Sequence, residues 1–499
     1  MINRTTKSER RTFKLLAQRT KGPKLYVDLF DFIAQKKSYD EEAILKKFPS
    51  IKKTQLSNLK AQLFKQVLRA IRDAHKDTYV SIKAREHFDF AKVLYAKGLY
   101  VASLDMLQRV KKLAAQTYNE PLLYLAINFE KQIESQHVTG SMHSKANKLS
   151  NQSADTIHSL ALTDILSSLS LRLYGIYLER GIVWDQEDRV YLTQFFETNM
   201  PTVNVDALNF YQRLYLFQSY VWYYHMLQDF PKYYRYASRW LELFKTFPEM
   251  QKPETVQMIK AYNNVLNALF MSEKVSLFEK HLDEFITFNS SGYFDLSTNE
   301  FSQWKLFTYV HRINQVFLSA DYKEAPDRLA DIIDHLEQPD IPYDLNRTIV
   351  FRYKIACVYF GAANLERAIY HLNAITNFAY KGFKQDIQTY ARILNLIAHF
   401  DLGNERLVSY QVKNVYRALL RMQEMSKVHQ EIFRFIRKTP SILPKDIRKE
   451  FIKLKQTLEP LGQDPVERRP FLYLDIISWL DSKIDNISMM EAIKRRKGL

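Results

Sequence analysis

Glycine is scarce along this chain, with 11 glycines among 499 residues, against an average usage of about 7%. β-Sheet folds and phosphate-binding loops depend on glycine for tight turns and for backbone with positive φ. The scarcity therefore predicts an all-α fold whose helices are joined by turns that mostly do without glycine. Because a single hydrophobic core rarely grows beyond about 250–300 residues, the length also predicts several domains or an extended helical solenoid.

The chain has one cysteine, Cys357, which cannot form an internal disulfide and therefore fits a reducing compartment. Cys357 lies in an apolar run over 355–359, so we expect a buried small side chain rather than a nucleophile. The first residues lack the apolar core of a signal peptide, and no stretch of about 18 uncharged apolar residues occurs. We expect a cytoplasmic protein without a membrane span.

Positive charge is concentrated at the two ends of the chain. Residues 1–86 hold 21 Lys/Arg and 9 Asp/Glu residues, and residues 411–499 hold 19 and 11, whereas the region between them is slightly acidic. This distribution favours an acidic partner at one or both ends, such as nucleic acid, an anionic membrane surface or an acidic protein. The alternative is that these lysines and arginines lie on solvated helix faces.

Residues 1–80 are predicted to form a basic helical module. Acidic residues suit the start of a helix over 41–48, and leucines at three- and four-residue steps predict a long helix over 54–75. This pair is compatible with a helix-turn-helix unit that contacts phosphate. The alternative is a three-helix bundle that docks on the first repeat. The side chains expected at phosphate are Lys52, Lys53, Lys60, Lys65, Arg69 and Arg72.

Residues 81–420 carry a recurring pattern of small and aromatic residues. Gly98 takes the turn between two predicted helices, Tyr100 follows two residues later, and Ser103 comes three residues after that. Small side chains at such points let the second helix approach the first, and aromatic side chains fill the wedge between neighbouring hairpins. The pattern recurs at Tyr322 and Ala325, at Tyr359, Ala363 and Ala368, and at Gly403.

The turn positions Ala320, Ala363 and Gly403 are 43 and 40 residues apart, which exceeds the 34 residues of a regular tetratricopeptide unit. The pattern therefore resembles tetratricopeptide repeats (TPR) with lengthened helices, in a divergent bacterial member of that superfamily. The resemblance implies a right-handed superhelical solenoid of long helical hairpins. Such solenoids typically present a concave face to a protein or peptide partner.

Residues 421–499 leave the repeat pattern. The apolar run over 471–480 predicts a helix that caps the C-terminal end of the solenoid. The basic residues Lys494 to Lys497 are expected to form a disordered tail.

The sequence offers no motif for chemistry. It has no Walker-type or dinucleotide-binding glycine pattern, no Gly-x-Ser-x-Gly elbow and no His-Glu-x-x-His pair. A single cysteine also excludes a zinc site built from thiolates. We therefore expect no catalytic residue, no bound metal and no cofactor, and we predict that the chain is not an enzyme.

Tyrosine and tryptophan crowd the stretch over 211–240. Both are favoured in binding surfaces because they combine a large apolar area with a polar tip, although helical spacing places some of them in the core. The residues expected to line a concave groove are Tyr215, Tyr220, Tyr223, Tyr224 and Tyr236.

The leading hypothesis is a non-catalytic scaffold that binds a protein or peptide partner in that groove. One alternative is a regulator that binds DNA or RNA through the basic N-terminal helices. Another is a peptide-sensing regulator that couples the N-terminal module to the repeats.

Overall fold

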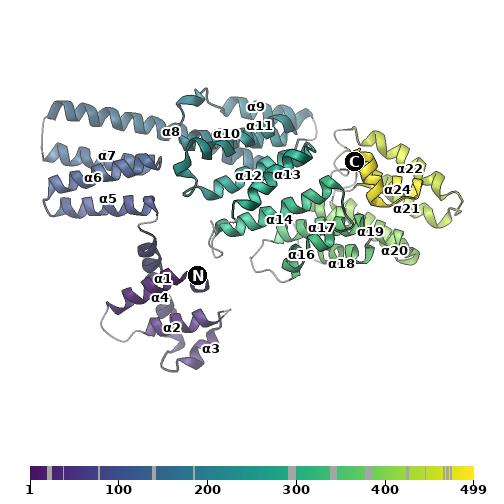
Figure 1. The fold of residues 1–499 in the computed structure, drawn as a ribbon, viewed down its shortest axis with the longest axis horizontal. Coiled ribbons are helices and arrows are strands. Elements are labelled where there is room, and N and C mark those ends of the chain that lie inside the picture. The colour runs from purple at the N-terminus through teal and green to yellow at the C-terminus, as the bar shows by residue number, and fades with distance from the viewer. Residues whose placement is uncertain are drawn as a thin grey trace.

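A computed structural model describes residues 1–498, apart from 20–24, 37–38, 77–78, 138–141, 184–185, 290–298, 338–344, 377–384, 423–425, 444, 465–466, 468–470 and 472–474. Within this described part the regular secondary structure is helical, without a β-strand, which confirms the all-α prediction. Consecutive helices pack against one another along the chain, as in a helical solenoid (Figure 1). None of the described helices combines the length and the apolar character needed to cross a bilayer.

The first four helices form a group with its own core. They are α1 (Lys7–Gln18), α2 (Leu25–Gln35), α3 (Glu41–Lys47) and α4 (Lys53–His75), and in Figure 1 they lie below the row formed by the other helices. The rings of Phe13 and Phe30 stack at 4.3 Å between centroids in the centre of this group. The observed bounds of α3 and α4 lie within a residue of the predicted helices.

The remaining α-helices are α5 (Val80–Ala96), α6 (Tyr100–Gln116), α7 (Glu120–Gln136), α8 (Met142–Arg180), α9 (Gln186–Asn199), α10 (Phe210–Met226), α11 (Phe230–Thr246), α12 (Thr255–Met271), α13 (Val275–Thr287), α14 (Asn299–Ser319), α15 (Ala325–Arg328), α16 (Ala330–Glu337), α17 (Leu345–Gly361), α18 (Leu365–Thr376), α19 (Gln385–Asp401), α20 (Glu405–Met422), α21 (Lys427–Lys438), α22 (Ile447–Leu461), α24 (Ile476–Asp485) and α25 (Met489–Lys497).

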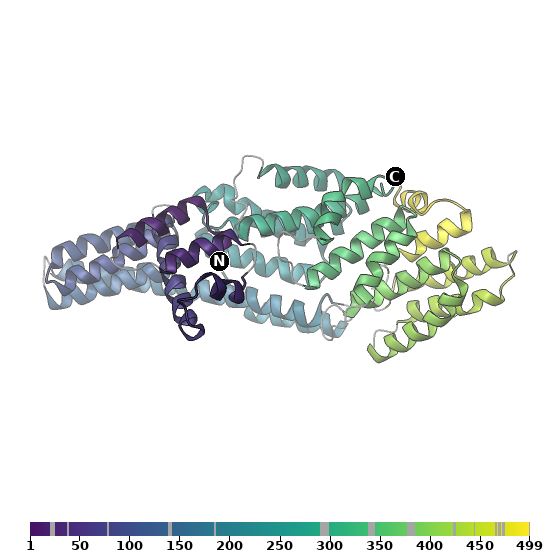
Figure 2. The ribbon, with the colours of Figure 1, turned by 90° about the horizontal axis from the view of Figure 1, so that it is seen from below.

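Helix α8 joins two groups of helices. Its 39 residues span about 58 Å at 1.5 Å per residue. Near its start, Lys145 pairs with Glu134 of α7, and further along Ser170 donates to Gln218 of α10 at 3.3 Å. Figure 2 shows the resulting elongated molecule, with α5–α7 near one end and the C-terminal helices at the other.

Seven helix-to-helix turns in the described part of the chain share one backbone geometry. One residue adopts positive φ, and the N–H of the next residue donates to the carbonyl five positions earlier at 2.8–3.1 Å. This ending satisfies carbonyls that a helix C-terminus leaves without partners. The positive-φ residues of these turns are Gly98, Tyr118, Gln228, Glu273, Ala363, Gly403 and Asn486. Ala320, another predicted turn residue, also has positive φ.

The predicted small residues lie at close contacts between helices. Ser103 is fully buried, and its hydroxyl donates to the carbonyl of Ala91 at 2.8 Å. Ala325 and Ala368 are fully buried as well. Small residues thus occupy fully buried positions in these helices.

The predicted aromatic residues pack beside these turns. The Tyr100 ring stacks on His137 at 3.8 Å between centroids, and the Tyr359 ring lies parallel to His371 at 5.6 Å. Tyr322 covers Gly361 so closely that a Cβ there would lie 2.6 Å from the tyrosine ring. Position 361 therefore requires glycine because a larger side chain would collide with the Tyr322 ring, and not because of its backbone conformation.

The expectation of a disordered basic tail is wrong, because Lys494 to Lys497 form the last turn of α25. Ser488 and Glu491 form a capping box at the start of this helix, and Ile493 is buried. The ammonium of Lys497 donates to the carbonyl of Phe317 in α14 at 2.7 Å. Basic side chains in a last turn also suit the negative end of the helix dipole.

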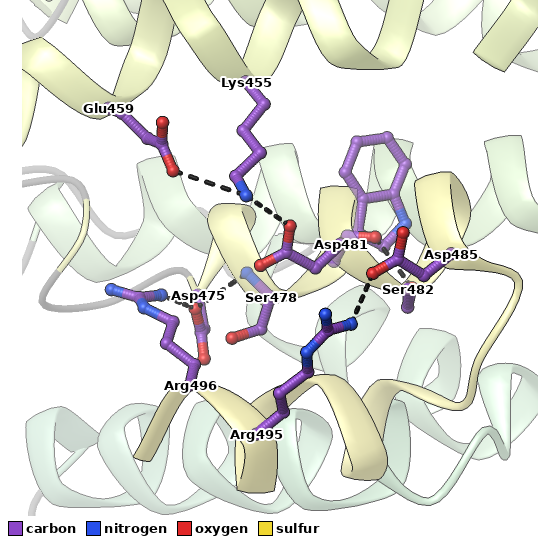
Figure 3. Close-up of polar contacts among 10 residues, drawn as sticks. Lys455, Glu459, Asp475, Ser478, Asp481, Ser482, Asp485, Arg495 and Arg496 are labelled. Atoms are coloured by element: carbon purple, nitrogen blue, oxygen red, sulfur yellow. Dashed lines mark hydrogen bonds and ion pairs between the residues drawn. The ribbon is translucent and has the colours of Figure 1, made fainter. Parts of the chain in front are cut away.

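Ion pairs connect α22, α24 and α25 (Figure 3). Arg496 contacts Asp475 at 2.5 Å, and Arg495 contacts Asp485 at 2.6 Å. Lys455 of α22 lies 2.7 Å from Asp481 of α24. Exposed pairs of this kind contribute about 0–1 kcal/mol each, so the buried apolar residues of these helices supply most of the stabilisation.

Replacing Gly98 with alanine should destabilise the chain by about 1 kcal/mol, because an L-residue is disfavoured in the left-handed backbone conformation. Gly98 has φ +76°, and an added Cβ would meet no atom within 4 Å, so the effect comes from the backbone alone. The measurement is the urea midpoint of unfolding followed by circular dichroism.

Gly175→Ala is the matched control, because a Cβ at Gly175 also meets no atom within 4 Å but the residue lies inside α8. Alanine should stabilise that helix by about 1 kcal/mol relative to glycine. Shifts of the same sign for both variants would contradict the assignment of Gly98 as a left-handed helix end.

Candidate binding groove

A groove of about 960 Å³ lies between alternate helices in the middle of the chain. Helices α8, α10, α12 and α14 each contribute side chains to it, and α11 contributes two residues from behind. The lining mixes polar and aromatic residues. The lining residues include Ser167, Ser170, Leu171, Tyr174, Tyr177, Tyr215, Gln218, Trp222, His225, Tyr233, Trp240, Lys260, Asn263, Asn264, Asn267, Met271, Gln303 and Arg347.

Side-chain amides form the polar part of the lining. Asn263, Asn264 and Asn267 come from adjacent turns of α12, while Gln218 comes from α10 and Gln303 from α14. An amide side chain offers both a hydrogen-bond donor and an acceptor. This surface can therefore pair with either kind of polar group without requiring a charge.

Hydrogen bonds orient several of these amides. The hydroxyl of Tyr233 donates to Asn264 Oδ1 at 2.9 Å, and Asn264 Nδ2 donates to the carbonyl of Lys260 at 2.8 Å. Gln218 Nε2 donates to Gln257 Oε1 at 2.9 Å. Amides held in this way lose little additional conformational freedom when a ligand binds.

Tyr233 occupies a position where the repeat pattern calls for a small residue. Its side chain is buried, with 1% of its surface exposed, and its hydroxyl reaches the groove lining at Asn264. Burial raises the pKa of the Tyr233 phenol, so the hydroxyl stays protonated and remains a donor. The larger side chain therefore supports the polar lining from behind.

Two histidines near the groove stay neutral. Burial lowers the pKa of His311 to about 3 and that of His225 to about 4. His311 Nε2 lies 3.1 Å from Asn263 Oδ1, which fits a neutral imidazole that donates to the amide oxygen. The groove thus keeps the same charge across the neutral pH range.

Trp240 presents a polar atom that the protein leaves unsatisfied. The side chain is 3% exposed, and its indole N–H finds no hydrogen-bond acceptor among the described residues. A buried donor without a partner costs about 1–3 kcal/mol. Trp240 borders the groove, but its indole nitrogen is itself buried, so this donor is not exposed to a ligand in the groove.

Aromatic and apolar side chains form the wall on the α8 side. The ring of Trp222 lies 4.8 Å from that of Tyr174 and 5.2 Å from that of Tyr177. Leu171 is 70% exposed and Tyr174 39%, which is high for apolar side chains of this size. Exposed apolar groups next to a groove are typical of protein-binding surfaces.

The five tyrosines predicted for the groove are divided between three environments. Tyr215 lines the groove. Tyr220, Tyr224 and Tyr236 instead stack on one another between α10 and α11, with Tyr220 and Tyr236 only 4.1 Å apart. Tyr223 is buried and stacks on Phe196 at 3.9 Å, so its ring belongs to the core.

Six basic residues predicted for the N-terminal module lie along or just before α4. Lys65, Arg69 and Arg72 are exposed on the side of the helix that faces away from its buried residues, and Lys52 and Lys53 are exposed at its start. Lys60 differs, because it contacts Glu41 at 3.2 Å and the Tyr39 hydroxyl at 3.1 Å. Its hydrogen bonds to these partners raise the pKa of Lys60.

Sequence reasoning missed the asparagines of α12 and the tryptophan at position 222 as groove residues. The available signal was Asn263, Asn264 and Asn267 within an otherwise apolar helix. Amide residues three or four positions apart lie on one side of a helix, so they indicate that α12 has a polar face.

Comparisons of this chain with protein-family models, with curated proteins and with solved structures find no match.

Replacing His311 with glutamine should make the stability of the protein less sensitive to mild acid. In the folded state the pKa of His311 is lowered to about 3 from 6.5, so between these values the unfolded chain binds a proton that the folded chain does not. The free energy of unfolding is therefore highest above about pH 6.5 and decreases as the pH falls. For one such histidine the decrease is about 1 kcal/mol between pH 7 and pH 5.5.

Urea midpoints at the two pH values measure this loss, which should be smaller in His311→Gln than in the wild type. His281→Gln serves as a control, because His281 is less buried than His311. Its Nδ1 lies 3.2 Å from a carboxylate oxygen of Glu284. An unchanged pH dependence in His311→Gln would show that His311 is not buried in neutral form.

Proposed function

We propose that this chain is a non-catalytic interaction scaffold that holds an extended segment of a partner protein in the groove between α8, α10, α12 and α14. The observation that carries the proposal is the polar lining, in which side-chain amides from the three helices α10, α12 and α14 border one groove. An extended peptide presents carbonyls and N–H groups along its length, and side-chain amides can pair with both.

The wall residues indicate how the partner segment would gain affinity. Leu171 and Tyr174 are exposed beside the amides, and apolar side chains of the partner would bury them. Binding energy in protein interfaces is concentrated in such aromatic and apolar anchors, while polar contacts set register. Lys260 and Arg347 are the charged residues that line the groove within the described part of the chain, so most of the lining would recognise hydrogen-bonding groups rather than charge.

We also propose that the helical hairpins are tetratricopeptide-like repeats that wind into a right-handed superhelix. The spacing of the turn residues, the shared turn geometry and the buried small residues Ser103, Ala325 and Ala368 support this assignment. In the same proposal α24 and α25 cap the C-terminal end of the superhelix.

Replacing Ser167 with arginine should block partner binding, because Ser167 lines the groove on α8 and is only partly buried. The added side chain would occupy the groove without entering the core. We expect a partner protein that co-purifies with the wild-type chain at low salt to be lost from the variant, as measured by affinity capture and mass spectrometry.

Ser168→Arg is the matched control, because Ser168 is exposed on the same helix and does not line the groove. A photo-crosslinking residue at Leu171, which lines the groove, should form a covalent adduct with the same partner in the wild-type background. Equal capture by the two arginine variants would contradict the proposed site.

A second candidate function is binding of nucleic acid by α4. The observation that favours it is the exposed face formed by Lys65, Arg69 and Arg72. Arg72 has only a 3.4 Å contact to Asp73, a weak surface pair, so these cations remain available to phosphate. Lys60 is a poor candidate for this role because Glu41 already neutralises it.

Reversing the charge of this face with Lys65→Glu, Arg69→Glu and Arg72→Glu should weaken binding to mixed-sequence DNA or RNA. Each phosphate contact contributes about 0.9 to the slope of log affinity against log salt, so the slope should fall by about 3. Fluorescence anisotropy at several salt concentrations measures both quantities.

The control carries the same change in charge on the middle of the chain, as Lys274→Glu, Lys280→Glu and Lys323→Glu, all at exposed positions. If the control loses affinity equally, the binding comes from net charge alone. Absence of binding by the wild-type chain at low salt would remove this candidate function.

A further inference from the structure

A second cavity lies where the C-terminal helices fold back onto the middle of the chain. Its volume is about 340 Å³, and side chains from α12, α14, α17, α19, α24 and α25 surround it. Most of the lining is apolar, including Phe270, Phe317, Phe360, Ile387, Trp479 and Ile493. Ligand pockets range from about 300 to 1,000 Å³, so this cavity suits a small, mainly apolar molecule.

One lysine interrupts this apolar lining. Lys354 of α17 borders the cavity, and its ammonium lies 5.7 Å from the ring centroid of Phe270 and 5.9 Å from that of Phe317. It donates one hydrogen bond, to the neutral Asn314 Oδ1. Among the described residues it forms no ion pair, so two of its three donors and its charge are left without an anionic partner.

The other charged groups of the cavity are already engaged. Asp475 lies 2.5 Å from Arg496 and accepts a hydrogen bond from the backbone N–H of Ser478 at 3.2 Å. Lys497 donates to the carbonyl of Phe317 at 2.7 Å. The cavity therefore has an excess of positive charge, and Lys354 is the group that carries it into the apolar part.

An ammonium held in this way is costly for the folded protein. Burial lowers the pKa of Lys354 to about 8, because the apolar surroundings disfavour the charged form. Proteins seldom bury an unpaired charge unless it serves a purpose. A bound anion would pair with the ammonium and offset the desolvation.

We propose that this cavity binds a single-chain amphiphile with one carboxylate, as in a medium-chain fatty acid anion. The carboxylate would pair with Lys354, and the alkyl chain would lie against Phe270, Phe317 and Trp479. The volume excludes a two-chain lipid, and a single unpaired ammonium matches a monoanion better than a phosphate dianion, which requires several donors. The proposal does not depend on the function of the groove.

The first experiment titrates the full-length chain with hexanoate, octanoate and decanoate by isothermal calorimetry. We expect one site, with affinity that rises about fourfold for each added methylene until the cavity is full. Decanol and decylamine test the head group and should bind at least tenfold more weakly than decanoate, because neither places an anion beside Lys354.

The second experiment replaces Lys354 with methionine, which has a similar length and no charge. The variant should lose at least tenfold in decanoate affinity and should unfold at the same or a higher temperature, since a buried unpaired charge is removed. Lys323→Met is the matched control, because Lys323 is exposed and does not line the cavity.

Proton uptake gives a further measurement that needs no variant. Above about pH 8 the free Lys354 loses its proton, so binding of decanoate should take up a proton, which calorimetry in buffers of different ionisation enthalpy detects. Burial raises the pKa of Cys357 to about 12 and also that of Tyr322, so these neighbours remain protonated and do not contribute.

Three results would overturn the proposal. The first is no binding of decanoate to the folded wild-type chain. The second is decanol binding as tightly as decanoate, because the cavity would then not recognise an anion. The third is binding of decanoate without proton uptake above about pH 8 together with undiminished affinity in Lys354→Met.

Discussion

The residue at positive φ between successive helices is the constraint on which the arrangement of this chain depends. A helix end leaves carbonyls without donors, and the N–H that follows the positive-φ residue returns to one of them. The chain thereby reverses within three or four residues, so the next helix packs directly against the previous one. Because hairpins follow one another in this way, α10, α12 and α14 all contribute to the same groove, while α11 supports it from behind.

Some of these turns can be predicted from the sequence, and others cannot. Gly98, Ala363 and Gly403 were found because small residues stand at the turn and at the crossing that follows. Tyr118 and Glu273 adopt the same backbone conformation, yet such residues carry no signal for positive φ, which costs an L-residue about 1–2 kcal/mol. Packing of the flanking helices offsets that cost, and packing is not visible in a single sequence.

The groove was harder to predict than the fold for a similar reason. The crowding of tyrosines over 211–240 points to the hairpin of α10 and α11, but only the structure shows which face of α10 borders the groove. Tyr215 and Trp222 lie on that face, whereas Tyr220 and Tyr224 lie on the face that packs on Tyr236. At the C-terminus, by contrast, the signal was present, because Ser488 and Glu491 have the spacing of a capping box ahead of the basic residues.

The groove and the C-terminal cavity differ in the charge of their buried polar groups. This difference determines which ligands each of them suits. Around the groove, burial keeps His225 and His311 neutral, and the amides that line it pair with polar groups irrespective of charge. A partner held in the proposed groove would be recognised by shape and by hydrogen bonds, which salt screens little. In the cavity, burial leaves the ammonium of Lys354 beside aromatic rings with a neutral partner, so an anion gains far more from entering than a neutral molecule of the same size. Met271 of α12 borders both the groove and the cavity. The hydrogen-bonding lining of the groove and the positively charged cavity are therefore neighbours at this residue.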